Sequence, residues 1–143
     1  MAKKCLDEIV SDNLAGAAMK MLDWTGLTYD RGDGGKTGHI DHNDRRAALR
    51  TINAVFAPGD DGPFIRDAYD AFFDGFERLE HFVRINLIIF EDVEMAFRYY
   101  VEKMAAAEDR RVFNSYLETY GFKLAQDFLK RFASWGAAQP PLP

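Results

Sequence analysis

The densest group of chemically reactive side chains in the sequence is the segment His39-Ile40-Asp41-His42-Asn43-Asp44. Imidazole nitrogens and carboxylate oxygens bind divalent metals and transfer protons, so one interpretation is a metal or acid–base site. The residues of this candidate metal site are His39, Asp41 and His42. Asp30 or Asp33 would have to supply further ligands. The alternative interpretation is a polar segment in which Asp41 or Asn43 caps the helix that follows.

A second group, the acidic stripe, recurs at intervals of three and four residues within one predicted helix. Its members are Asp67, Asp70, Asp74, Glu77 and His81. This spacing places all of them on one helix face, opposite Phe72 and Phe76. The stripe is suited to a basic partner or a cation, and equally to a solvated helix face. A carboxylate-bridged di-iron centre is excluded, because such a centre needs two Glu-x-x-His pairs, and Glu77 and His81 lie four residues apart.

Other catalytic or cofactor motifs are incomplete. Gly35-Lys36-Thr37 matches the end of the phosphate-binding pattern G-x-x-x-x-G-K-[ST], but Asp30 stands where its first glycine is required. No serine lies in a Gly-x-Ser-x-Gly setting, and the one cysteine, Cys5, lies near the N-terminus. We therefore assign no cofactor and expect a non-enzymatic protein.

The elements that must position these residues are helices. Apolar residues recur at helical spacing in five segments, which are residues 6–22, 41–56, 63–85, 93–107 and 109–133. The first helix can restart at Ser11, and the last should break at Gly121. In the second, we expect Arg45, Arg46 and Arg50 to face water. The pattern predicts an all-α fold, a compact bundle of five to six helices, in one domain over residues 1–135 with a proline-rich tail over 136–143.

One long segment interrupts this helical pattern. Residues 23–42 include five of the eleven glycines, and no alternating pattern there is long enough to indicate a strand. We therefore expect a long glycine-rich loop. Loops of this length inside small domains are usually functional or disordered.

Composition and charge exclude several classes of partner. The chain has 143 residues and a net charge of −5, which gives no general attraction to nucleic acid or to anionic membranes. The longest apolar run, Leu87–Phe90, is far shorter than a membrane span of about 20 residues. A single cysteine permits no intrachain disulfide, which suits a reducing compartment, so we expect a cytoplasmic protein.

The aromatic residues suggest a binding surface. Eleven of the twelve phenylalanines and five of the six tyrosines follow residue 63. We expect Phe73, Met95 and Tyr99 to form an interface that pairs two copies of the chain or binds another protein. The alternative is a small-molecule pocket between helices, with hydroxyl groups from Tyr99, Tyr100, Tyr116 and Tyr120.

The segment Phe72–Val83 (FFDGFERLEHFV), the apolar turn Leu87–Phe90 and the aromatic helix containing Phe97–Tyr100 (FRYY) resemble small helical bacterial proteins known only as domains of unknown function. The resemblance covers about residues 63–130. It implies a helical, cytoplasmic bacterial protein and carries over no catalytic residue.

Two hypotheses follow from the sequence. The first is a non-enzymatic interaction or regulatory module, homodimeric, that binds through its aromatic and acidic faces. The second is a ligand- or metal-dependent activity that uses residues 30–44 with His39, Asp41 and His42.

Overall fold

A computed structural model describes residues 2–23, 26–30, 37–51, 56 and 60–136 of the chain. Its described part contains eight helices and one two-stranded sheet. The helices are α1 (Ala2–Ser11), α2 (Asn13–Leu22), α3 (His42–Ala48), α4 (Gly62–Arg84), α5 (Phe90–Met104), α6 (Ala107–Thr119), α7 (Lys123–Lys130) and α8 (Ala133–Gly136). The strands are β1 (Leu27–Asp30) and β2 (Thr37–Ile40). The predicted all-α class is confirmed, with this small hairpin as an addition.

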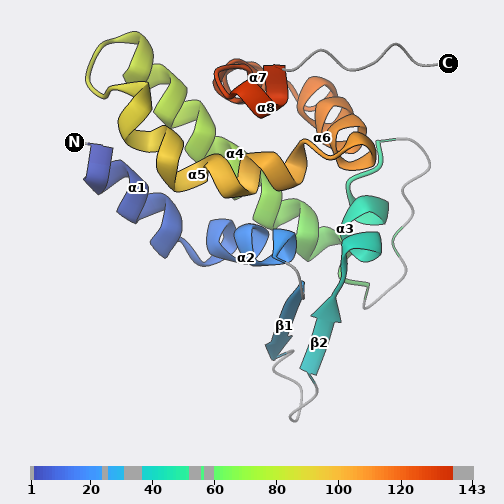
Figure 1. Cartoon of the computed structure of the whole chain (residues 1–143). Helices are drawn as coiled ribbons and strands as arrows, with labels where there is room; N and C mark the ends of the chain where they lie inside the picture. Colours follow the sequence, from blue (N-terminus) through green and yellow to red (C-terminus); the bar gives the residue numbers. More distant parts are fainter. Residues whose placement is uncertain (1, 24–25, 31–36, 52–55, 57–59, 137–143) are drawn as a thin grey trace, which may run out of the picture.

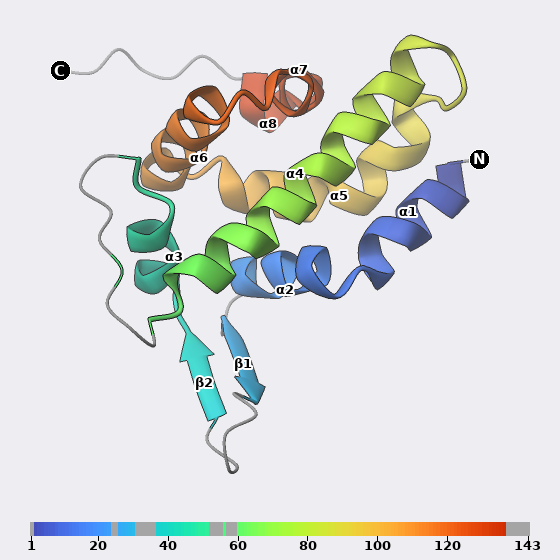
Figure 2. The ribbon, with the colours of Figure 1, turned by 180° about the vertical axis from the view of Figure 1, so that it is seen from behind.

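Helix α4, the longest of the described helices, crosses the molecule diagonally in Figures 1 and 2 and lies in front of the other helices in Figure 2. It begins where the sequence predicts, with Pro63 in its first turn, where a missing backbone N–H costs nothing. It packs against α2, α7, α3 and α1, and the ring of Phe97 on α5 reaches its Phe72 and Phe76 rings. Its buried apolar residues are Ile65, Ala68, Tyr69, Phe72, Phe73, Phe76 and Leu79.

The centre of the core is a cluster of aromatic rings contributed by three helices. The ring of Phe76 on α4 lies 4.5 Å from Phe72, 5.4 Å from Phe97 of α5 and 4.9 Å from Phe128 of α7, measured between ring centroids. Contacts at these distances contribute about 0.5–1.5 kcal/mol each beyond the area they bury. The cluster therefore joins α4, α5 and α7 into one unit.

Breaks in two of the predicted helices turn the five predicted segments into eight helices, because the first segment divides once and the last divides twice, before α7 and again before α8. The first segment divides at Asp12, whose carboxylate accepts a 2.8 Å hydrogen bond from the backbone N–H of Ala15 and caps α2. The last segment divides at Gly121, as predicted, where a φ of +74° suits glycine. The helix expected over 41–56 ends at Ala48, and residues 52–55 lie outside the described part.

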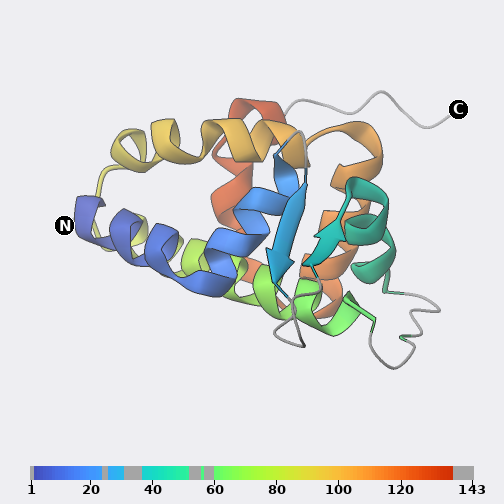
Figure 3. The ribbon, with the colours of Figure 1, turned by 90° about the horizontal axis from the view of Figure 1, so that it is seen from below.

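The expectation of an unstructured loop over residues 23–42 is wrong for residues 27–30 and 37–40. These residues form an antiparallel hairpin in which Leu27 pairs with Ile40 and Thr28 with His39. The hairpin stands outside the helical body in Figures 1 and 2 and faces the viewer in Figure 3. Leu27 and Ile40 are buried and attach it to the core. Strands of four residues are too short for their alternating pattern to be recognised in the sequence.

Arginine side chains form buried ion pairs that the sequence analysis did not predict. Arg45 and Arg46, which we expected in water, both reach Asp109 near the start of α6, at 2.9 Å from Nη1 of Arg45 and 2.8 Å from Nε of Arg46. Arg45 is fully buried, and its guanidinium also lies over the ring of Phe113. Asp109 therefore holds the short helix α3 against α6.

A second buried carboxylate, Glu80, joins α4 to the C-terminal part of the chain. Its side chain accepts hydrogen bonds from Arg131 at 2.6 Å and from Arg84 at 2.7 Å. Arg84 also contacts Asp127 of α7 at 2.5 Å. Burial alone would raise the pKa of Glu80, but the hydrogen bonds from Arg131 and Arg84 outweigh it and lower that pKa.

None of the described helices is both long enough and apolar enough to cross a membrane.

We predict that Asp109→Asn lowers the free energy of unfolding by about 3 kcal/mol, because the neutral amide leaves the buried Arg45 guanidinium without an opposite charge. Urea unfolding at pH 7 measures this loss. Glu108→Gln is the matched control, since Glu108 is the neighbouring residue, is exposed and lies 3.8 Å from Arg46. It should leave the unfolding free energy nearly unchanged.

The same pair should make stability depend on pH. Burial alone would raise the pKa of Asp109, but hydrogen bonds from Arg46 and Arg45 hold that pKa below its ordinary value. A carboxylate of this kind stabilises the fold above its unfolded pKa of about 3.9, and the stabilisation is lost as the pH falls through the folded pKa. The wild type should therefore lose stability below about pH 4 more steeply than Asp109→Asn. Parallel curves for the two proteins would contradict this role.

Candidate functional site

The two histidines of the candidate metal site lie in different elements. His39 is exposed on β2, and its Nδ1 lies 2.9 Å from the hydroxyl of Thr28 on β1. His42 is the first residue of α3, and its Nδ1 lies 3.2 Å from a terminal nitrogen of Arg45. Because a guanidinium only donates hydrogen bonds, this nitrogen of His42 accepts. Both imidazoles thus use one ring nitrogen in contacts within the chain.

Asp41 caps helix α3. Its carboxylate accepts a 2.8 Å hydrogen bond from the backbone N–H of Asp44, and the carboxylate of Asp44 accepts one of 3.1 Å from the N–H of Asp41. This reciprocal pair is a capping box. The hydrogen bond from the backbone of Asp44 lowers the pKa of Asp41. The interpretation of Asp41 as a helix cap is confirmed.

Within the described residues, no group of three or more His, Cys, Asp or Glu side chains is placed to hold a metal ion. The side chains of Asp30 and Asp33, which the metal hypothesis needs as further ligands, lie outside the described part of the structure. The metal site therefore stays a prediction, and the structural role of Asp41 accounts for that residue without it.

The acidic stripe on α4 is divided between internal contacts and solvent. The carboxylate of Asp70 accepts a 2.7 Å hydrogen bond from the hydroxyl of Tyr116, and that of Glu77 accepts one of 2.6 Å from the backbone N–H of Ala125. Ala125 lies in the first turn of α7, which has no side-chain cap from its own N-cap residue. Glu77 therefore caps α7 from another helix, while Asp67, Asp74 and His81 remain exposed.

Phe73, which we expected at an interface, is instead part of the core. Its side chain is fully buried, and its ring centroid lies 6.0 Å from that of Phe113 and 5.6 Å from that of Phe122. The reason is that α6 and the segment before α7 cover this side of α4. Helical periodicity identifies the residues at the centre of a buried face. It does not show which residues beside that centre a neighbouring helix will also bury.

Met95 and Tyr99, the other two predicted interface residues, are exposed on α5. They are one turn apart on α5, on the side opposite its buried residues Val93, Phe97 and Val101, and they are 78% and 45% exposed. On the same side, the Nζ of Lys103 lies 5.4 Å from the ring of Tyr99. We call the surface formed by Asp92, Met95, Tyr99 and Lys103 the α5 outer face.

The four tyrosines of the alternative pocket hypothesis are not brought together. Tyr99 and Tyr100 lie on α5, whereas Tyr116 and Tyr120 lie at the end of α6. Tyr116 and Tyr120 do line a cavity of about 460 Å³ between α6 and the first half of α4. Half of the predicted hydroxyl set is therefore at a pocket. Arg66 also lines this cavity. The sequence does not single it out, because it is one of many charged residues on an amphipathic helix.

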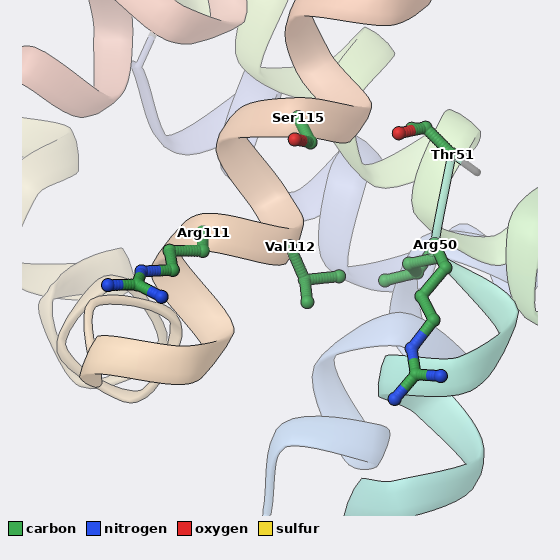
Figure 4. A pocket seen from close by; sticks show the side chains of 6 residues that line it. Arg50, Thr51, Arg111, Val112 and Ser115 are labelled. Carbon is green, nitrogen blue, oxygen red and sulfur yellow. The ribbon is translucent and has the colours of Figure 1, made fainter.

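A second, smaller pocket of about 240 Å³ lies between the end of α3 and α6 (Figure 4). Arg50, Thr51, Arg111 and Ser115 line it and would suit an anion if their polar groups converged. In Figure 4 the two guanidinium groups point in different directions, both away from the hydroxyls of Thr51 and Ser115. This pocket is also below the roughly 300–1,000 Å³ that ligand sites usually occupy, so of these two the cavity of about 460 Å³ is the stronger candidate.

No family model, no curated protein and no solved structure matches this chain. The resemblance to small helical bacterial proteins therefore stays a prediction.

We predict that Asp41→Ala lowers the free energy of unfolding by about 1 kcal/mol, because α3 loses its N-terminal cap, and that Asp41→Asn leaves it nearly unchanged, because asparagine caps equally well. Thermal unfolding with and without zinc chloride measures both effects. If the structural role is the only one, zinc shifts no melting temperature. A zinc-dependent rise in the wild type that His42→Ala abolishes would instead support the metal site.

Proposed function

We propose that this protein is a non-enzymatic helical interaction module that pairs with a second copy of itself through the α5 outer face. The observation that carries the proposal is the 78% exposure of Met95 beside Tyr99 on a helix whose other side is fully packed. Methionine and tyrosine are enriched at protein interfaces. A partner that packs on this face would bury the exposed apolar surface of both side chains without displacing α5. Pairing with a second copy is the commonest arrangement among soluble oligomers.

The residue pattern of this face supports an antiparallel pairing about a two-fold axis. Met95 and Tyr99 lie symmetrically about Phe97, so an axis at that position places Met95 of each copy against Tyr99 of the other. A two-fold interface repeats every contact twice. The antiparallel arrangement also sets the two helix dipoles side by side in opposite directions, so that the positive end of each lies beside the negative end of the other.

Charges at the two ends of the face complement each other in the same arrangement. Asp92 and Lys103 lie eleven residues apart, three helical turns, and thus on one stripe beside Tyr99. They are five and six residues from the proposed axis, so Asp92 of each copy meets Lys103 of the other. A parallel pairing would instead put like charges together. Charge complementarity therefore favours a second copy of the chain in this one orientation.

The surface next to this stripe needs no partner for its charges. Glu94 and Arg98 form an ion pair on α5 with two hydrogen bonds of 2.6 Å. Hydrogen bonding from Arg98 lowers the pKa of Glu94. These residues suit the solvated rim of an interface, which leaves Met95 and Tyr99 at its centre.

We expect the wild type to sediment as a dimer and Tyr99→Asp to weaken the dimer at least about tenfold, because the substitution puts a charge at the centre of an apolar contact. Sedimentation velocity over a range of concentrations measures the dissociation constant. Tyr120→Asp is the matched control, since Tyr120 is about as exposed as Tyr99 but is the residue that follows α6, outside the α5 outer face. A wild-type protein that is monomeric at all concentrations would overturn the proposal.

A charge exchange tests the orientation. Asp92→Lys and Lys103→Asp should each weaken the dimer several-fold, because each creates two like-charge contacts across the axis. The double variant restores opposite charges and should recover most of the affinity. Additive losses in the double variant would contradict the antiparallel arrangement.

A further inference from the structure

The cavity of about 460 Å³ between α4 and α6 has aromatic walls. Phe56, Tyr116, Tyr120 and Phe122 contribute rings, and Pro63 adds an apolar surface. Its volume lies within the range of small-molecule sites. The cavity uses none of the residues of the α5 outer face, so what it binds is a question separate from self-association.

Among the described residues that line the cavity, one side chain is basic, and it is already engaged within the protein. Arg66 donates to the carbonyl of Ala48 at 2.8 Å, to the carbonyl of Arg50 at 2.7 Å and to the hydroxyl of Tyr120 at 2.8 Å. Its guanidinium also lies 5.1–5.7 Å from the ring centroids of Phe56, Tyr116 and Tyr120. Arg66 therefore binds the C-terminal end of α3 and forms part of the cavity wall.

The remaining charges at the cavity are negative. Asp67 is exposed and has no ion pair or hydrogen bond to the described residues, and Asp70 uses one carboxylate oxygen to accept from Tyr116. These two carboxylates lie three residues apart on one face of α4. Helix α6 ends at Thr119, so the negative end of its dipole also points toward this region. The first turn of α4 opposes this effect, but the carboxylate of Asp60 already accepts a hydrogen bond from the backbone N–H of Gly62 in that turn.

We propose that this cavity binds an organic cation, a protonated amine with a flat apolar body. The ammonium group pairs with Asp67 and the free oxygen of Asp70, and the apolar body lies against Tyr120, Phe122 and Phe56. Aromatic faces attract cations, and partial enclosure strengthens both this attraction and the ion pair. An anion of the same shape would be repelled by two carboxylates. The one arginine that could attract it, Arg66, already donates its N–H groups to two backbone carbonyls and to Tyr120.

Titration of the ¹⁵N-labelled full chain with 2-phenylethylamine, followed by NMR, tests this proposal. We expect saturable shifts of the Arg66 side-chain Nε–H and of the backbone N–H groups of Asp67 and Tyr120. The neutral analogue 2-phenylethanol has the same body without the charge and should bind at least about tenfold more weakly. Equal binding of the two compounds would overturn the proposal, as would an absence of saturable shifts at these residues up to about 10 mM amine.

Two substitutions distinguish the effect of the cavity carboxylate on amine binding from the effect of the overall negative charge of α4. Asp67→Asn should weaken amine binding several-fold, and Asp67 makes no internal contact on which the described fold depends. Asp74→Asn removes the same charge from an exposed position outside the cavity and should leave binding within about twofold of the wild type. Equal losses in both variants would show non-specific attraction and contradict the site. Tyr99→Asp should not change amine binding, so a failure of self-association leaves this test unaffected.

Discussion

The structure depends on the burial of α4 on several of its sides at once. A 23-residue helix surrounded in this way cannot turn all of its polar residues to water, so its acidic side chains must find partners in neighbouring elements. Three acidic side chains of α4 accept hydrogen bonds from later elements. Asp70 accepts from the hydroxyl of Tyr116, Glu77 accepts from the backbone N–H of Ala125, and Glu80 accepts from Arg131. These three contacts fix α6 and α7 along α4. They determine the position of the C-terminal helices as much as the aromatic core does.

The short helix α3 depends on arginines in a similar way. Seven residues are too few for a stable helix in isolation, so tertiary contacts must supply its stability. Asp109 holds Arg45 and Arg46 of α3 against α6, while Arg66 of α4 binds the carbonyls at the C-terminal end of α3. Because Arg66 also forms a wall of the larger cavity, the placement of α3 and the shape of that cavity have one common cause.

The sequence predicts the elements that rest on long periodic patterns and on strong local signals. Helix α4 has Pro63 in its first turn as expected, α5 has its apolar stripe, and Gly121 divides the last helical segment. The sequence does not predict features that depend on contacts between residues far apart in the chain. The strands of the hairpin are too short for their pattern to be read, and Phe73 and Arg45 are buried because α6 covers them. For the candidate sites, exposure of Met95 and Tyr99 followed from periodicity alone, whereas the cavity required the fold.

The α5 outer face and the cavity are separated by the closely packed aromatic core. The inward side of α5 reaches α4 through Phe97, which packs on Phe72 and Phe76, whereas the cavity lies against the first turns of α4 and the end of α6. Coupling between distant sites needs an element with two discrete arrangements. Closely packed rings offer no second arrangement of comparable energy. If both proposals hold, we therefore expect self-association and cation binding to be independent of each other, so that an amine in the cavity leaves the dissociation constant of the dimer unchanged.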